Sequence, residues 1–221
     1  GYTLPDQREI FSLEELCESF EIKRMSLGGP IFDLAKLKWL NGRYLREKLT
    51  EKEVVNRLIE WKFNSDFVQK IIPHALQRLE NFSDFLPLAG FLFNEHPTIA
   101  LNELVGKIEP DEASKLLKIF EWELEKITEW ERDEISQIFQ KIAEVEDKKL
   151  KEVLPLFFQA MSGAKVSLPL FDAMTILGPD LVRFRLRNAL GLLSSEGAWL
   201  SKKRLKALEK EYRAKYGNRI D

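Results

Sequence analysis

The sequence of 221 residues contains a single cysteine, Cys17, and two histidines, His74 and His96. One cysteine excludes an intramolecular disulfide and a cysteine-based zinc site, which agrees with a reducing compartment. Neither histidine has a second histidine or a carboxylate at the spacing of helical metal ligands, so we interpret both as structural or surface residues. We expect Cys17, which lies within a helical apolar pattern, to face the core.

Long hydrophobic runs are also missing. No apolar stretch approaches the ~20 residues of a membrane span. The first residues, GYTLPDQRE, have neither the basic start nor the apolar stretch of a signal peptide. We therefore expect a cytoplasmic protein without a membrane-spanning segment.

The motifs of enzyme active sites are equally scarce. The sequence has no glycine-rich loop after a strand pattern, no nucleophile elbow and no paired-carboxylate constellation. Carboxylates at helical spacing, such as Glu121 with Glu125, are typical of solvated helix faces. The residues by themselves therefore indicate no catalytic site.

Helical patterns, by contrast, fill the sequence. With 44% hydrophobic and 11% aromatic residues the chain can bury a core, and its apolar residues recur at helical spacing. Capping boxes predict helix starts after Ser12, Thr50 and Thr128. Pro73 predicts the end or a kink of a helix that begins near residue 65. The sequence therefore predicts an all-α fold.

Residues 32–46, FDLAKLKWLNGRYLR, carry two helical stripes at once. The apolar stripe, which we expect a core to cover, consists of Leu34, Leu37, Leu40, Tyr44 and Leu45. The opposite, basic stripe consists of Lys36, Trp39, Arg43 and Arg46. Cations around an exposed indole can hold phosphates and stack on a sugar or base. Alternatively the stripe is a solvated face with its indole packed on a neighbouring helix, and the pattern alone leaves both interpretations open.

The net charge of −2 hides a division along the chain. Cations dominate after Pro179, among them Arg183, Arg185 and Arg187. A local positive field of this kind can bind phosphate whatever the total charge. Residues 201–216 predict a further basic helix with Leu205, Leu208 and Tyr212 on one side. This helix either adds nonspecific RNA affinity or is a solubilising end helix docked through its leucines.

The order FD, KL, WLN and YLR within residues 32–46 resembles the stem-contact segment of bacterial glutamyl-tRNA synthetases. Two other blocks agree with it. REIFSLEELCESFEIKRMS, before this segment, resembles the lead-in of that family, and LPLFDAMTILGPDLVRFRLRNAL, much later, resembles its last shared block. The resemblance spans residues 9–190.

This resemblance implies the C-terminal part of such a class I enzyme. Residues 1–48 would end the stem-contact region, 49–93 would form the first helical lobe of the anticodon-binding region, and 94–221 would form the second lobe with a basic extension. The family attaches glutamate to tRNA with ATP, in a catalytic domain whose HIGH-like and KMSKS-like motifs are missing here. We therefore expect a monomeric chain that binds glutamate tRNA without catalysis. Its partner would be a catalytic domain, to which ATP and Mg²⁺ would belong.

The resemblance also implies binding residues. The tRNA stem would be contacted by Lys36, Trp39, Arg43 and Arg46. The anticodon would be held by Arg78, in the segment QRLENFSDFLPLAGFLF, and by Ser167, Leu168 and Leu170, in GAKVSLPLF. No catalytic residue and no metal ligand is implied within this chain.

One position departs from the family pattern. The family often reads R-x-A-L-T-G before the second anticodon segment, where this sequence has Phe158 in place of the arginine. The missing guanidinium removes one expected contact. Either Lys165 or Gln159 compensates, or discrimination between anticodons is weaker.

Composition alone favours a function of another class, namely an all-helical adaptor whose apolar grooves bind a partner helix. Its charges would then serve solubility alone. Matching blocks at both ends, in the right order, are not expected of a generic adaptor. They favour tRNA binding.

Overall fold

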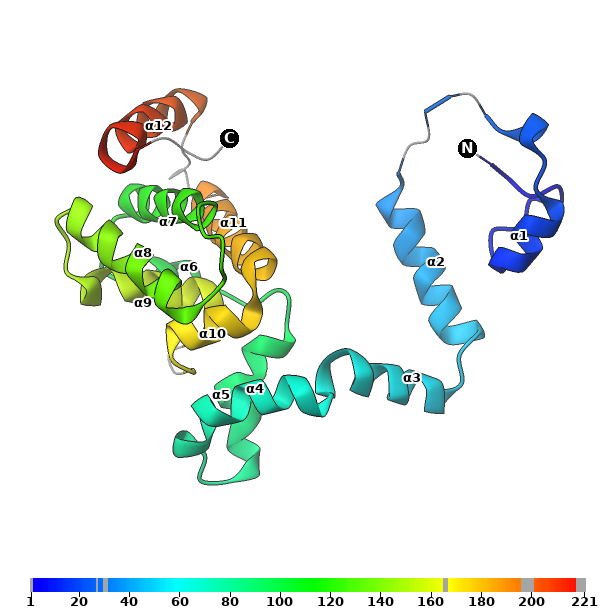
Figure 1. Cartoon of the computed structure of the whole chain (residues 1–221), viewed down its shortest axis with the longest axis horizontal. Helices are drawn as coiled ribbons and strands as arrows, with labels where there is room; N and C mark the ends of the chain where they lie inside the picture. The colour runs from blue at the N-terminus through cyan, green and yellow to red at the C-terminus, as the bar shows by residue number, and fades with distance from the viewer. Residues whose placement is uncertain (1, 27, 30–31, 165–166, 196–200, 218–221) are drawn as a thin grey trace. The chain divides into compact units, whose positions relative to one another are not determined.

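A computed structural model describes residues 2–26, 28–29, 32–164, 167–195 and 201–217, and throughout these ranges the regular elements are helices (Figure 1). The prediction of an all-α fold is confirmed. Contacts divide the chain into two compact units, Gly1–Asn64 (unit 1) and Ser65–Asp221 (unit 2). The expected segment boundaries after residues 48 and 93 stay predictions.

Unit 1 consists of short helices whose starts follow the capping rules. Its α-helices are α1 (Leu13–Ser19), α2 (Leu34–Glu47) and α3 (Glu51–Leu58), with a 3-10 turn at Ile22–Arg24 and a π-helical turn at Ile59–Phe63. The capping boxes that begin at Ser12 and Thr50 are both formed. Asp33 caps α2 by accepting a hydrogen bond from the backbone N–H of Lys36 at 2.9 Å. These starts are local, which is why the sequence predicts them.

Most of the apolar stripe of α2 is exposed, with Leu40 half-buried, so the prediction that a core covers it is wrong within this structure. Leu34 is 61% exposed and Leu37 is 48% exposed. Cys17 is also exposed rather than facing a core. A helical stripe is buried only where another element packs on it. Among the described residues of unit 1, Leu4 alone is buried.

Unit 2 begins with a small lobe of short helices. It contains α4 (Ser65–Ala75), 3-10 turns at Leu76–Arg78 and Phe82–Asp84, α5 (Phe85–Ala89) and a 3-10 turn at Gly90–Phe93. Helix α4 continues past Pro73 to Ala75, so of the two predicted effects, an end or a kink of the helix, the end does not occur at this proline. Ile71 and Ala75, on either side of Pro73, are fully buried in one apolar cluster. This packing holds the helical conformation that the proline disfavours.

The larger part of unit 2 is a bundle around α7. Its helices are α6 (Leu101–Val105), α7 (Pro110–Leu124), α8 (Arg132–Val145), α9 (Leu150–Ser162), α10 (Leu170–Leu177), α11 (Pro179–Ser195) and α12 (Lys202–Tyr216). Helix α7 packs against α8 and α11. The rings of Phe120, Phe139 and Phe157 meet at the centre, with centroids 4.2 to 4.9 Å apart. This cluster gives the bundle its hydrophobic core.

The capping box predicted at Thr128 is not formed, because α8 begins later than expected. Glu131 is the N-cap residue and makes no side-chain capping bond. Just before it, the indole N–H of Trp130 donates to the carbonyl of Met174 at 3.0 Å. That contact comes from a segment distant in the sequence, so the local pattern cannot reveal it.

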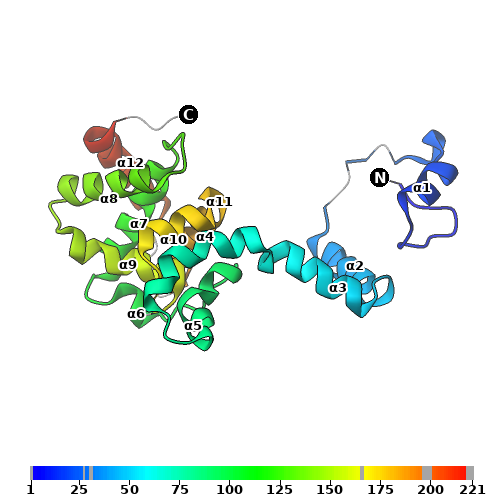
Figure 2. The same cartoon turned by 60° about the horizontal axis from the view of Figure 1, so that its bottom comes forward.

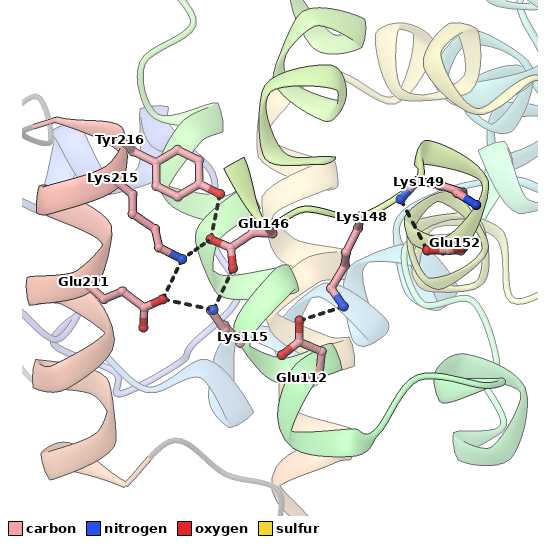
Figure 3. Close-up of polar contacts among 9 residues, drawn as sticks. All are labelled: Glu112, Lys115, Glu146, Lys148, Lys149, Glu152, Glu211, Lys215 and Tyr216. Atoms are coloured by element: carbon pink, nitrogen blue, oxygen red, sulfur yellow. Dashed lines mark hydrogen bonds and ion pairs between the residues drawn. The ribbon is translucent and has the colours of Figure 1, made fainter. Parts of the chain in front are cut away.

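Helix α12 is docked on the bundle through tyrosines and buried carboxylates. Tyr212 is fully buried and its hydroxyl donates to Glu123 at 2.6 Å. The side chain of Glu146 is 4% exposed and accepts hydrogen bonds from Lys115 at 2.6 Å and from Tyr216 at 3.0 Å (Figure 3). The helix is thus docked as predicted, with Leu208 buried in the same core, while its contribution to RNA affinity stays a prediction.

Acid should release α12 from the bundle. Burial, the largest single influence, disfavours the ionised form of Glu146. The hydrogen bonds from Lys115 and Tyr216 and the charges of Lys115 and Lys215 together outweigh it, so the pKa lies below the usual 4.5. A carboxylate with a lowered pKa stabilises the fold above its unfolded pKa, and this stabilisation is lost as the pH falls through the folded-state pKa. We expect Glu146→Gln to destabilise unit 2 by about 2 kcal/mol at neutral pH, and to flatten the loss of stability below about pH 4.5.

Urea unfolding between pH 3 and 7, followed by near-ultraviolet circular dichroism of the tyrosines, measures this effect. Glu144→Gln, at an exposed position two residues away, is the matched control. Equal pH profiles for the native chain and Glu146→Gln would show that Glu146 does not hold the helix.

Candidate functional site

The basic stripe of α2 forms an exposed surface in unit 1. Trp39 is 46% exposed, so it is not packed into a neighbouring helix of the described chain. The guanidinium of Arg43 lies over the Trp39 ring, 5.3 Å from its centroid. The structure therefore brings the indole and a cation together, as the helical spacing predicts.

Two of the stripe's cations are paired with carboxylates of unit 1. Lys36 contacts Glu9 at 2.5 Å, and this hydrogen bond raises the pKa of Lys36. Arg43 donates through Nε and Nη2 to both oxygens of Glu47, each at 2.7 Å. Exposed pairs of this kind contribute little to stability. A phosphate would have to compete with these carboxylates for the same donors.

The second group of predicted residues lies in unit 2, where Arg78 meets the segment that begins at Ser167. Arg78 closes the 3-10 turn after α4 and is exposed. Its Nη1 donates to the carbonyl oxygen of Ser167 at 2.5 Å. Asp84, one of the carboxylates that could have paired with Arg78, instead accepts from the backbone N–H groups of Glu80 and Asn81. The structure thus joins two predicted residues that are 89 positions apart in the sequence.

Ser167 and Leu168 of that segment are less accessible than a direct contact requires. Leu168 is fully buried and belongs to the apolar cluster of α4 and α5. Ser167 is 3% exposed, and its hydroxyl donates to the carbonyl of Leu168 at 3.2 Å. Leu170 is half-buried at the start of α10. Of the four residues implied to hold the anticodon, Arg78 is the one that presents hydrogen-bond donors at the surface.

Further contacts fix α10 against α4 and α8. Ala173 joins the same apolar cluster as Leu168. Asp172 accepts from Nε of Arg132 at 3.1 Å and lies 3.6 Å from Nδ1 of His74. The segment that receives Arg78 is therefore held by packing and by polar contacts on both sides.

The position of the missing family arginine is filled without a new surface cation. Phe158 is half-buried. Gln159 is buried and donates to the carbonyl of Ala164 at 3.2 Å, so it supports the turn from inside. Lys165 lies outside the described residues. Gln159 is therefore not available to replace an exposed guanidinium.

Arg185, counted above among surface cations, is fully buried. Its guanidinium donates to the carbonyls of Met161, Phe91 and Asn94, the bond to Phe91 measuring 2.7 Å. Burial lowers the pKa of Arg185 to about 10. The sequence carries a signal for this position, because Arg185 lies three residues after Val182 and four before Ala189, both buried.

Gly163, directly after α9, brings the chain close to residues 97 and 98. Its φ is +63°, and a Cβ built there would lie 2.4 Å from the carbonyl oxygen of Thr98. Glycine is suited to a left-handed conformation in such close contact. Together with Arg185, it fixes the end of α9 against the connection between the small lobe and the bundle.

Other charges expected to be solvated are also used inside the bundle. Glu121 is 2% exposed and pairs with Lys118 at 2.6 Å and with Arg187 at 2.7 Å, so the prediction of a solvated face is wrong there. Arg183 lies near the carbonyl of Leu124. Of the described cations after Pro179, Arg187 and those of α12 are exposed. Helix α12 lies at the end of unit 2 opposite α5 in both views (Figure 1 and Figure 2).

Two classes of site are not found in the part of the chain that the structure describes. No group of histidine, cysteine, aspartate and glutamate side chains there could hold a metal ion. No helix there is long and apolar enough to cross a membrane.

Curated relatives are similar over nearly the whole chain. The glutamate–tRNA ligase of Pseudomonas fluorescens (strain Pf0-1) is 45% identical over 212 residues, which cover 95% of this chain and 42% of the relative. That of Stutzerimonas stutzeri (strain A1501) is 45% identical over 214 residues, with the same coverage. The chain thus spans less than half the length of these relatives. The uncovered 5% of 221 residues is about 11 residues, fewer than the 15 of α12, so this helix is at least partly matched.

A solved structure and a family model complete the comparison. The crystal structure of a glutamate tRNA ligase from Elizabethkingia meningosepticum has a TM-score of 0.53 at 19% identity, covering 87% of this chain and 39% of that one. It shows a similar fold. The family model for the anticodon binding domain matches residues 52–190, more than half of the sequence. The chain belongs to the anticodon-binding domain family.

Proposed function

We propose that this chain recognises the tRNA that accepts glutamate, as part of a glutamate–tRNA ligase whose catalysis takes place elsewhere. The observation that carries the proposal is the contact of Arg78 with Ser167. It orients an exposed guanidinium inside the family-matched region, residues 52–190. The same match supports tRNA recognition over an adaptor for protein partners.

Arg78 is suited to read the third anticodon base. One of its N–H groups is engaged by the Ser167 carbonyl, which leaves other donors for a base. A guanidinium has only donors, so it fits the O2 and N3 acceptors of cytosine, the third anticodon base of glutamate tRNA. On the same base-pairing edge, guanine, the third anticodon base of glutamine tRNA, would present its N1 and N2 hydrogens. Donor would face donor, and glutamine tRNA would be disfavoured.

Ser167, Leu168 and Leu170 have a different part in this proposal. Ser167 positions Arg78 through its carbonyl, and buried Leu168 anchors the segment in the core. Leu170, half-buried, is the position left for a direct contact with the anticodon. Recognition then depends on one exposed side chain and on a rigid segment behind it.

The basic stripe of α2 would bind the tRNA backbone. Lys36, Arg43 and Arg46 supply the cations, and exposed Trp39 supplies a ring for a sugar or base. Backbone contacts carry no sequence information, so this surface would add affinity for all tRNAs alike. In the complete ligase, acting as a monomer in the cytoplasm, ATP and Mg²⁺ would serve the catalytic part.

Arg78→Gln should reduce the preference for glutamate tRNA over glutamine tRNA by roughly ten- to a hundredfold. The estimate follows from ~1–3 kcal/mol for a good base-specific contact, by analogy with DNA readout. Affinities of the native chain and the variant for both tRNAs, measured at one salt concentration, give the ratio. Arg213→Gln, at an exposed position of α12, is the matched control and should leave the ratio unchanged.

Two outcomes would reject this function. The first is a native chain without preference between the two tRNAs. The second is binding that does not depend on salt, because about four neutralised phosphates should give a slope of log K against log salt between roughly −3 and −4. An unchanged ratio in Arg78→Gln, with the native preference intact, would reject only the role of Arg78.

A further inference from the structure

Phe82 is 100% exposed, although phenylalanine is among the residues most often buried. It opens the 3-10 turn Phe82–Asp84, four residues after Arg78. Other phenylalanines of the same lobe serve its core: Phe67 and Phe85 contact Phe93, with ring centroids 5.4 and 6.0 Å away. The lobe therefore packs its other aromatic rings inward and leaves this one in solvent.

The turn that carries Phe82 is held rigidly. The carboxylate of Asp84 accepts from the backbone N–H groups of Asn81 at 2.7 Å and Glu80 at 3.0 Å. The N–H of Asp84 in turn donates to the carbonyl of Asn81 at 3.1 Å. Because these bonds fix the backbone beside Phe82, the ring is attached at a defined place on the lobe.

An exposed guanidinium and an exposed ring, here on the consecutive 3-10 turns that carry Arg78 and Phe82, are the combination with which proteins hold unpaired RNA bases. The ring stacks on a base, and the cation contacts a base edge or a phosphate. Arg78, held by the Ser167 carbonyl at 2.5 Å, supplies the cation. We propose that the ring of Phe82 stacks on an unpaired base next to the base that Arg78 contacts. This inference rests on the proposed function.

Phe82→Ala should weaken binding of the full chain to the anticodon stem-loop of glutamate tRNA by about five- to a hundredfold, the range for loss of one stacked base. Phe82→Leu, which keeps an apolar side chain but no ring, should weaken it similarly. Phe82→Tyr should bind within about twofold of the native chain, because the ring is retained. A fully exposed side chain supports no packing, so circular dichroism and the unfolding midpoint should not change.

Two further measurements separate stacking from general apolar contact. Leu86→Ala removes another exposed apolar side chain of the lobe, 59% exposed, and should leave RNA affinity unchanged. Phe82→Trp should gain a fluorescence component that the stem-loop quenches, over and above any change seen in the native chain. Both results are specific to a ring in contact with a base.

The outcomes distinguish this inference from the function beneath it. Native affinity retained in Phe82→Ala overturns the stacking role and leaves tRNA recognition standing. A native chain that self-associates, and that loses this association but not its RNA affinity in Phe82→Ala and Leu86→Ala, would assign the apolar surface to a protein partner. That result would also overturn the stacking role of Phe82. A native chain that does not bind the stem-loop overturns the proposed function and the inference together.

Discussion

Arg185→Ala is expected to destabilise unit 2 by about 3–5 kcal/mol. The substitution removes a charged donor from the carbonyls of Met161, Phe91 and Asn94. A buried acceptor that loses its donor costs about 1–3 kcal/mol, and the vacated volume adds a cavity term. Relief from burying a guanidinium, whose pKa falls to about 10, offsets only part of this loss.

Urea unfolding measures the change in the free energy of unfolding, provided that the slope of this free energy against urea concentration is the same in both proteins. Arg185→Lys should fall between the native chain and the alanine variant, since one ammonium keeps the charge but cannot reproduce the planar fork. Arg213→Ala removes an exposed arginine that pairs with Glu209 and should cost less than about 1 kcal/mol. If Arg185→Ala lowers the free energy of unfolding by less than about 1 kcal/mol, groups other than Arg185 hold the end of α9 against the small lobe.

Gly163→Ala should cost about 2–5 kcal/mol. Left-handed backbone costs a non-glycine residue roughly 1–2 kcal/mol, and φ at Gly163 is +63°. The added Cβ would also stand 2.4 Å from the carbonyl oxygen of Thr98. The backbone at residue 163 or at Thr98 must therefore move, at a cost of about 1–3 kcal/mol.

Gly191→Ala is a matched control of opposite sign. Gly191 lies within α11, and a Cβ there meets nothing within 4 Å. Alanine is about 0.5–1 kcal/mol better than glycine inside a helix, so this variant should be slightly more stable than the native chain. The two variants, compared by urea unfolding, should therefore move in opposite directions. Equal stability of both would rule out a close contact at Gly163.

The features that sequence analysis predicted correctly are those decided by neighbouring residues. Ser12 and Thr50 begin helices because their partners stand three positions away. The spacing of Trp39 and Arg43 places them one helical turn apart, and the structure shows them in contact. Periodicity likewise indicated the all-α fold, because each helix shows it independently.

The failures arise where a distant residue decides. Glu121 has the spacing of a solvated carboxylate, but Arg187 and Lys118 neutralise it inside the bundle. Arg185 was grouped with phosphate-binding cations because charge alone does not reveal burial. Arg78 and Ser167 are 89 positions apart, so only the family resemblance placed both in one site.

The apolar cluster beneath Arg78 has a consequence for how unit 2 folds. Ile71, Ala75 and Leu92 of the small lobe share it with Leu168 and Ala173, which follow much later in the chain. Arg185 adds contacts to Phe91 and Asn94 over sequence separations of 94 and 91 residues. Such contacts must wait for a long loop to close. The small lobe therefore has no complete interior until α10 and α11 have been synthesised, and the surface that carries Arg78 forms in one cooperative transition rather than in a lobe that folds first.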